Sequence, residues 1–401
     1  MTDLMRDSLD HCVKCTICET FCPVSAATPL FPGPKAAGPQ GERYRAVAPS
    51  PDSSIDWCSS CGICTYVCPQ DVKIAEINSQ ARAAMKQEHG IPFRDRMISR
   101  TTLTGRLGTP FAPIANRALR SQVVRRAMQR TLGIHRNAPM PQFAGHTLRR
   151  WLRRRPMATG EQTIVYFHGC AANYYEVETG RMAVEVLEHN GFRVIAPPQG
   201  CCGLPLQSNG LYDDARAYVR KLAAQLAPHA REGHDIVATS TSCGLMLKRE
   251  AREILGVDDD DLAVVGSRTV DICELLLDLH ERGELRTDFQ RVEMTVPYHA
   301  PCQLRGHGIG TPALDLMRLI PGVEVVESET MCCGVAGTYG LKAEKYEVAM
   351  QVGRDLFQLV RDMEPEVAVC DSETCRWQIT HATGVQSVHP VALLHRAYGL
   401  E

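Results

Sequence analysis

Two runs of four cysteines near the start of this 401-residue chain constrain its fold more than any other feature. The runs share one spacing, Cys12-x-x-Cys15-x-x-Cys18-x-x-x-Cys22-Pro and Cys58-x-x-Cys61-x-x-Cys64-x-x-x-Cys68-Pro. Three thiols on one short loop can bind three irons of a cubane, and the fourth thiol must come from a distant segment. The proline after the fourth cysteine turns each run away from helix. The pattern therefore predicts two [4Fe–4S] clusters.

The spacing also predicts which thiols share a cluster. In two-cluster chains of this ferredoxin type, the fourth cysteine of each run ligates the cluster of the other run. We expect one cluster to take Cys12, Cys15, Cys18 and Cys68, and the other to take Cys22, Cys58, Cys61 and Cys64. Zinc is a weaker interpretation, because zinc sites use two separated cysteine pairs and not four thiols within eleven residues. Structural disulfides are weaker still, since we expect a reducing cytosol.

Positive charge is concentrated in one segment of the chain. Fourteen arginines and no acidic residue lie between Arg96 and Arg155, so with a net charge of −2 the remainder carries −16. The first eleven residues lack the apolar run of a secretory signal, and no stretch reaches eighteen apolar residues. We therefore expect no secretory signal and no membrane span.

Apolar residues interleave with these arginines. Prolines interrupt the segment, and short helices are expected over residues 113–132 and 145–154. Basic and apolar residues together are typical of a surface that docks on anionic lipid, and the residues expected there are Arg149, Arg150, Trp151 and Arg153. The alternatives are a solvated basic face, a dock for an acidic partner subunit, or a nucleic-acid site. We favour the membrane and expect no nucleic-acid partner.

The rest of the chain is an internal repeat. Cys170, Cys201-Cys202 and Cys243 recur as Cys302, Cys332-Cys333 and Cys375, at offsets of 132, 131 and 132 residues. Strands are expected over residues 163–168, 192–196 and 235–239, and again over 294–299, 323–327 and 367–370, with helices between them. This alternation predicts two α/β units. The expected organisation is an α-helical ferredoxin module (1–90), an Arg-rich linker and membrane-docking segment (91–160) and duplicated α/β cysteine-rich domains (161–290 and 291–401).

A Cys-Cys-Gly turn presents two thiols to one point, and its glycine permits a tight turn. With the flanking cysteines, four thiols can converge in each half, namely Cys170, Cys201, Cys202 and Cys243, and Cys302, Cys332, Cys333 and Cys375. Each set could hold a further iron–sulfur cluster, zinc or a redox-active disulfide. Cys273 lies in an apolar run and is expected to be a buried core thiol. No dinucleotide fingerprint, flavin motif or catalytic triad is present, so no catalytic residue is predicted.

The doubled C…CCG…C pattern resembles the cysteine-rich CCG domain of the heterodisulfide reductase B subunit and of iron–sulfur subunits of glycolate and lactate oxidases. A finer resemblance covers essentially the whole chain and is to the family of the C subunit of anaerobic glycerol-3-phosphate dehydrogenase. The residues that carry it are 18–24, 31–39, 71–74 and 373–378. One departure from heterodisulfide reductase matters, because Ser240 and Ser372 stand where that enzyme has the first cysteine of a C-x-x-C pair. A five-thiolate site is therefore unavailable in the first half, and Cys370 in the second is out of register.

This resemblance implies an electron-transfer subunit, peripheral on the cytoplasmic face of the inner membrane. It implies that FAD-containing partner subunits oxidise glycerol 3-phosphate and that electrons leave to menaquinone or another quinone. His168, His299, Arg305 and His307 are candidate quinone contacts. The alternatives are a glycolate or lactate flavoprotein as the donor, a thiol–disulfide enzyme like heterodisulfide reductase, and a metal-free binding module.

Overall fold

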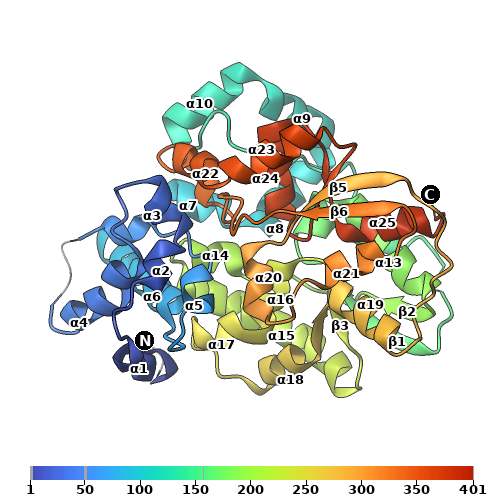
Figure 1. Ribbon diagram of the computed structural model, residues 1–401, viewed down its shortest axis with the longest axis horizontal. Helices are drawn as coiled ribbons and strands as arrows, with labels where there is room; N and C mark the ends of the chain where they lie inside the picture. Colours follow the sequence, from blue (N-terminus) through green and yellow to red (C-terminus); the bar gives the residue numbers. More distant parts are fainter. Residues whose placement is uncertain (1–2, 49–51, 157, 401) are drawn as a thin grey trace.

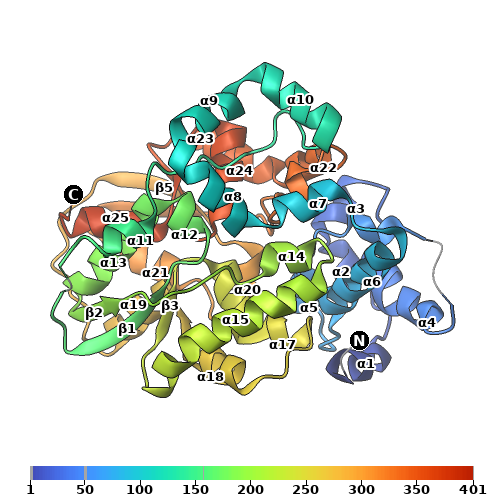
Figure 2. The same cartoon turned by 180° about the vertical axis from the view of Figure 1, so that it is seen from behind.

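The computed structural model describes residues 3–48, 52–156 and 158–400. Figure 1 shows the N-terminal module on one flank of the molecule, beside two α/β units that occupy the rest of the body. Helices α9 and α10 lie at one end, away from the strands, and the view from behind in Figure 2 shows the same arrangement.

The N-terminal module is helical, as the sequence predicts. Its α-helices are α1 Asp3–Ser8, α2 Ile17–Thr20, α3 Pro23–Ala27, α4 Gly41–Arg45, α5 Ile63–Tyr66 and α6 Ile74–His89. No strand occurs in the described parts of residues 3–89. Helix α3 begins at Pro23, where its fixed φ suits the first helical position and its missing N–H costs nothing. Cys22 is therefore the cap of that helix, and the chain changes direction directly after the thiol.

Each α/β unit contains a four-stranded parallel sheet. The first has β1 Gln162–Phe167, β2 Phe192–Ile195, β3 Ile236–Ala238 and β4 Thr269–Asp271 in the order β2-β1-β3-β4. The second has β5 Met294–His299, β6 Val323–Glu327, β7 Ala368–Cys370 and β8 Ser387–Val388 in the order β6-β5-β7-β8. The equivalent orders confirm two α/β units. The short strands β4 and β8 escape sequence prediction because two or three residues show no period.

Helices cover both sheets. In the first unit they are α12 Ala171–Tyr174, α13 Val177–His189, α14 Leu204–Ser208, α15 Tyr212–Arg231, α16 Thr241–Leu245, η5 Met246–Glu250, α17 Ala251–Glu253, α18 Asp260–Arg268 and α19 Ile272–Glu281. In the second they are α20 Cys302–His307, α21 Pro312–Arg318, η6 Tyr339–Leu341, α22 Tyr346–Val352, α23 Arg354–Met363, α24 Glu373–Thr383 and α25 Pro390–Ala397. One apolar core includes residues of both units, such as Leu187, Leu276 and Leu316. Cys273 lies fully buried in it, which confirms the expected core thiol.

The second unit breaks its long amphipathic pattern at Gly353. The spacing of Tyr346, Ala349 and Leu356 predicts one helix, whereas the structure has α22 and α23. A side chain at Gly353 would collide with the Phe357 ring and the carbonyl oxygen of Cys333. Close packing against the Cys-Cys-Gly turn therefore decides the break.

The Arg-rich segment forms five short α-helices, α7 Phe93–Ile98, α8 Thr101–Gly108, α9 Ala112–Arg120, α10 Gln122–Leu132 and α11 Leu148–Leu152. Ser121 interrupts the helix predicted over 113–132, because its extended conformation ends α9 and caps α10. In the described part of the chain, no helix is both long enough and apolar enough to cross a bilayer.

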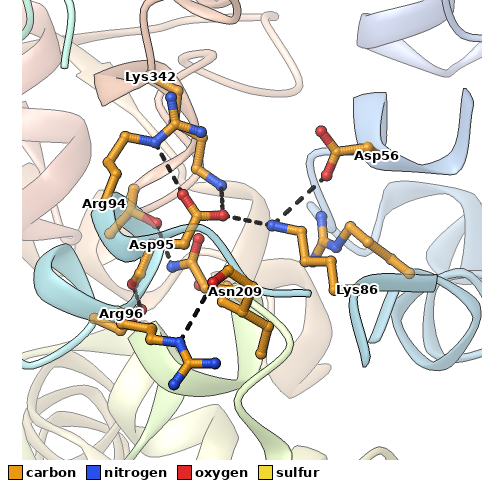
Figure 3. A network of polar contacts seen from close by, with 12 residues as sticks. Asp56, Lys86, Arg94, Asp95, Arg96, Asn209 and Lys342 are labelled. Atoms are coloured by element: carbon orange, nitrogen blue, oxygen red, sulfur yellow. Dashed lines mark hydrogen bonds and ion pairs between the residues drawn. The ribbon is translucent and has the colours of Figure 1, made fainter. Parts of the chain in front are cut away.

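A buried ionic network joins three parts of the chain at Asp95 on α7 (Figure 3). The Asp95 carboxylate lies 2.6 Å from the Lys86 ammonium of α6 and 2.9 Å from that of Lys342, and Arg94 contacts it at 2.9 Å. Lys86 also pairs with Asp56 at 3.6 Å. Burial alone would raise the pKa of Asp95, but Lys342 and Lys86 hold it well below its ordinary value of 3.8. Asp95 thus stays ionised and fastens the N-terminal module to the second α/β unit.

Replacing Asp95 with asparagine should destabilise the protein by about 3–5 kcal/mol, because it leaves buried cations without a counter-charge. Denaturant unfolding monitored by circular dichroism measures the change. Asp213→Asn is the matched control and should change little, since the Asp213 side chain is 91% exposed in its pair with Arg216. Because the folded pKa of Asp95 is depressed, its contribution is present above pH 3.8 and is lost as the pH falls further. Equal stability of the two variants would contradict the role given to Asp95.

Candidate iron–sulfur sites and the cavity between them

The thiols of the N-terminal module gather around two small cavities. One is lined by Cys12, Cys15, Cys18 and Cys68. The other is lined by Cys22, Cys58, Cys61 and Cys64. Each cavity therefore combines three thiols of one run with the fourth thiol of the other run, which is the arrangement that crossed ligation requires.

The two thiol loops have the same backbone conformation. Lys14 and Thr16 adopt positive φ angles of 60° and 68°, and Ser60 and Gly62, at the equivalent positions, adopt 56° and 82°. Left-handed residues are costly without glycine, so three of them at matching positions indicate a loop held by its surroundings. Backbone amides also reach the thiols, as the Val72 N–H does at 3.4 Å from Cys68 Sγ.

These thiols suit a metal cluster and suit little else. Burial raises the pKa of Cys18 to about 11, and burial likewise raises the pKa of Cys64. A buried thiol loses its proton when a metal supplies the compensating charge. In each cavity four soft sulfur donors come together, which fits iron–sulfur chemistry.

Sheet topology explains why the repeated thiols converge. In the order β2-β1-β3-β4, the chain leaves β1 in one direction and returns to β3 on its other side, which creates a crevice at the carboxyl ends of these strands. Cys170 follows β1, Cys243 lies in the first turn of the helix after β3, and Cys201 and Cys202 follow β2. All four thiols therefore lie at one edge of the sheet. The second unit places its cysteines in the same way.

Sulfur–sulfur contacts confirm that the first set is compact. Cys170 Sγ lies 3.8 Å from Cys201 Sγ, and Cys202 Sγ lies 3.2 Å from Cys243 Sγ. Hydrogen bonds from Cys170 and then from Cys202 lower the pKa of the Cys201 thiol. Thr101 of α8 donates its hydroxyl to Cys170 Sγ at 3.2 Å. The sequence offers no signal for that threonine, because it lies 69 residues from its partner.

The second set is larger than its repeat partner. Cys333 Sγ lies 2.9 Å from Cys375 Sγ, and His299 places a ring nitrogen within 4.8 Å of both. Cys302 hydrogen-bonds with Cys332 and lowers its pKa, and Cys333 adds to that effect. Cys370, fully buried at the end of β7, also contacts Cys375. Its displacement in sequence therefore does not remove it from the site.

The two serines that replace cysteine play local roles. Ser240 caps α16 by accepting the backbone N–H of Cys243 at 3.4 Å, and its hydroxyl donates to Glu373 at 3.2 Å. Ser372 occupies the equivalent cap of α24 and is 2% exposed. Ser240 thus orients the thiol of Cys243 and links the two units.

A cavity of about 760 Å³ lies between the N-terminal module and both α/β units. Thiols from the N-terminal module and from both α/β units border it, namely Cys61, Cys68, Cys170, Cys201, Cys202, Cys243, Cys302, Cys333 and Cys375. Cys61 also borders the second small cavity, and Ile63 packs with Cys302 and Cys332. The second cubane site therefore adjoins the second repeat site. Of the four candidate quinone contacts, Arg305 borders the large cavity, whereas His168, His299 and His307 do not.

Trp151, which the sequence predicts at the membrane, packs partly inward. Its half-buried ring contacts the shared apolar core and lies beneath the guanidinium groups of Arg155, at 4.7 Å, and Arg181, at 5.6 Å. Arg155 in turn pairs with Glu188. Cation–π contacts therefore hold the indole that the sequence assigns to lipid. Exposed large apolar side chains of the Arg-rich segment lie on α7 and on and beside α8–α10, and they are Phe93, Leu103, Leu107, Phe111, Ile114 and Val123.

Comparison with known families identifies the class of protein. Residues 8–72 match the 4Fe-4S dicluster domain, and residues 164–248 and 296–380 each match the cysteine-rich domain. The chain is thus an iron–sulfur protein in which a dicluster domain carries [4Fe–4S] clusters and precedes a duplicated cysteine-rich domain. The domain boundaries expected from the sequence stay a prediction.

Similarity over the whole chain identifies the family. The C subunit of anaerobic glycerol-3-phosphate dehydrogenase from Escherichia coli K12 is 38% identical over 405 residues, covering 97% of this chain and 98% of that protein. The chain belongs to this family. More distant relatives are the B subunit of fumarate reductase (CoM/CoB) from Methanothermobacter marburgensis, 29% identical over 58% of this chain and 44% of that protein, and lactate utilization protein A of Oceanobacillus iheyensis, 26% identical over 58% of this chain and 98% of that protein.

Single serine substitutions test the crossed ligation. Cys68→Ser and Cys15→Ser should remove the same cluster signal from the electron paramagnetic resonance spectrum of the reduced protein, because their thiols border one cavity. Cys22→Ser and Cys61→Ser should both remove the other signal. Each variant should lose about four irons. If Cys68→Ser instead matched Cys61→Ser, each run would hold its own cluster and the crossed assignment would be wrong.

Proposed function

We propose that this protein is the iron–sulfur electron-transfer subunit of an anaerobic glycerol-3-phosphate dehydrogenase complex. FAD-containing partner subunits oxidise the substrate, and the final acceptor is menaquinone or another quinone. The observation that carries the proposal is the contact of Cys61 and Ile63 with Cys302 and Cys332. It brings the loop of the second ferredoxin-type site into contact with the second repeated thiol set. When bound, iron–sulfur clusters accept and release single electrons.

The assignment of ligands is part of the proposal. Cys12, Cys15, Cys18 and Cys68 hold one [4Fe–4S] cluster, and Cys22, Cys58, Cys61 and Cys64 hold the other. The repeated sets centred on Cys201 and Cys332 bind one or two further clusters or zinc. Their compact thiols support a metal, because sulfur donors that converge on one point are what a cluster or zinc site requires.

Two other functions are weaker. The name of the lactate utilization relative favours a lactate flavoprotein as donor, but that similarity is lower and covers 58% of the chain. A thiol–disulfide enzyme like heterodisulfide reductase is disfavoured by Ser240, which caps a helix where that enzyme supplies a thiol.

We propose a membrane-docking surface, formed by the exposed apolar side chains of residues 103–123 and the arginines beside them. Phe111, Ile114 and Val123 are 65%, 72% and 73% exposed. Exposed arginines accompany them on the same helices, at positions 106, 117, 120, 126 and 130. Apolar side chains with flanking positive charge fit the headgroup region of an anionic leaflet. The proposed location is therefore peripheral, on the cytoplasmic face of the inner membrane.

The donor is tested with the purified complex. Anaerobic co-expression with candidate flavoprotein subunits should yield a complex that reduces a short-chain naphthoquinone with glycerol 3-phosphate, but not with lactate or glycolate. Iron and sulfide analysis should find about eight irons if the two cubanes are alone and about sixteen if each repeat adds a cluster. If the complex reduced the quinone with lactate and not with glycerol 3-phosphate, the proposed donor would be wrong.

Liposome co-sedimentation tests the docking surface. The double variant Ile114→Glu and Val123→Glu should abolish binding to vesicles containing phosphatidylglycerol, because two carboxylates then face anionic lipid. Charge reversal at Arg149, Arg150 and Arg153 should weaken binding less, since Trp151 between them packs inward. If charge reversal at these three arginines abolished binding and the double variant did not, the surface would lie on α11.

A further inference from the structure

The central cavity has two kinds of wall. One is apolar and comes from the Arg-rich segment, with Met97, Ile98, Leu119, Met128 and Phe143 among its residues. The other is polar and comes from α6, α14, η5 and α20. Ligand pockets of about 300–1,000 Å³ are typically apolar with a few polar groups that orient the ligand. The cavity therefore has the character of a site for an apolar molecule with a polar head.

Four side chains of the polar wall have polar atoms without a partner. They are Gln207 Oε1, Glu250 Oε2, Gln303 Oε1 and Arg305 Nε. Gln207 is 4% exposed, so its free oxygen has no access to bulk water. Buried polar atoms are rarely left unpaired in a native protein unless a ligand or an ordered water pairs with them. Of these atoms, Arg305 Nε is a donor that still needs an acceptor, and the glutamine oxygens still need donors, so the wall offers hydrogen-bond partners to a polar molecule in the cavity.

Three carboxylates, Glu76, Glu250 and Glu253, also border this wall. Two of them are occupied, because Glu76 accepts the Thr65 hydroxyl at 2.7 Å and Glu253 pairs with Arg249 at 3.2 Å. Glu250 instead has Gln207 as its side-chain partner. Burial, and then the charges of Glu76 and Glu253, raise the pKa of Glu250 to about 8. Glu250 therefore carries a proton at neutral pH.

We propose that the quinone head group binds at this polar wall and that Glu250 donates a proton to a quinone oxygen. The proposal rests on the function proposed above and assigns the acceptor site of that function. The unpartnered N–H of Arg305 and the protonated Glu250 offer hydrogen bonds to carbonyl oxygens. The apolar wall suits a hydrocarbon tail. Arg305 and Glu250 belong to different units, so the site exists only when both are in place.

Reduction of the quinone requires both electrons and protons. A quinone takes up two electrons and two protons to become a quinol, and the electrons originate from the flavin of the partner subunits. One proton moves from Glu250 to a quinone oxygen as an O–H bond forms. The resulting Glu250 carboxylate lies beside Glu76 and Glu253, and this repulsion favours its reprotonation from solvent before it donates the second proton.

The test compares Glu250→Gln with Glu281→Gln in the purified complex. Glu281 is an exposed glutamate at the end of α19, outside the cavity. Each complex is assayed with a short-chain naphthoquinone, which needs protons, and with ferricyanide, which does not. Glu250→Gln should lower quinone reduction about a hundredfold, within the usual range for a lost general acid, and leave ferricyanide reduction unchanged. The wild-type quinone rate should fall as the pH rises through about 8, and the variant should lose this dependence.

An azido-naphthoquinone photolabel provides a readout that does not depend on turnover. It should attach to peptides containing residues 245–254 or 301–308. The same peptides should be labelled in the wild type and in Glu250→Gln. Circular dichroism checks that each variant is folded, and Glu250→Gln should not lower Tm, because the amide has nearly the shape of the protonated carboxyl group that it replaces.

Failure of the proposed quinone site can be distinguished from failure of the proposed function. The inference would be wrong if the wild type reduced quinone and Glu250→Gln did so equally well. It would also be wrong if the photolabel attached to other peptides. Neither result would contradict the proposed function. A wild-type complex that reduces ferricyanide but not quinone would overturn the proposed acceptor, and the site with it.

Discussion

Four thiols from separate segments must reach one point at each site, and the rest of the structure depends on this requirement. In the N-terminal module, two tight loops and two proline-terminated turns meet it. In the repeats, the reversal of strand order meets it, because the carboxyl ends of β1 and β3, or of β5 and β7, flank one crevice. Burial then raises the pKa of thiols such as Cys64, so these sites are completed by a metal.

The relative placement of the sites depends on charge as well as on apolar packing. Asp95 lies where α6, α7 and the second α/β unit meet, and it pairs with cations from all three. A buried ion pair adds little net stability compared with apolar packing, but it penalises any arrangement that leaves one charge alone. This network therefore favours the one docking of the module that brings Cys61 against Cys332.

The Arg-rich segment has two faces with different environments. Leu119 and Met128 border the central cavity, while Ile114 and Val123 on the same helices face solvent. A helix pair that separates an internal apolar cavity from an exposed basic and apolar surface suits an acceptor that arrives from a lipid phase. The exposed arginines of these helices thus lie on the outer side of the cavity wall, and the apolar inner side is evident only in the folded chain.

The sequence by itself determined the chemistry of this protein. Ligand spacing is local, so each cysteine run predicts three ligands of one cluster within a few residues, and the repeat offsets reveal the duplicated α/β unit. Tertiary structure decided what depends on distant partners. In the folded chain Cys370 contacts the second thiol set. Trp151 packs beneath two arginines, and Thr101 donates a hydrogen bond to Cys170. Folding also brings Gln207, Glu250 and Arg305 around one cavity. These contacts join residues from different helices and units, and a pattern along the chain carries no record of which distant side chains fold against one another.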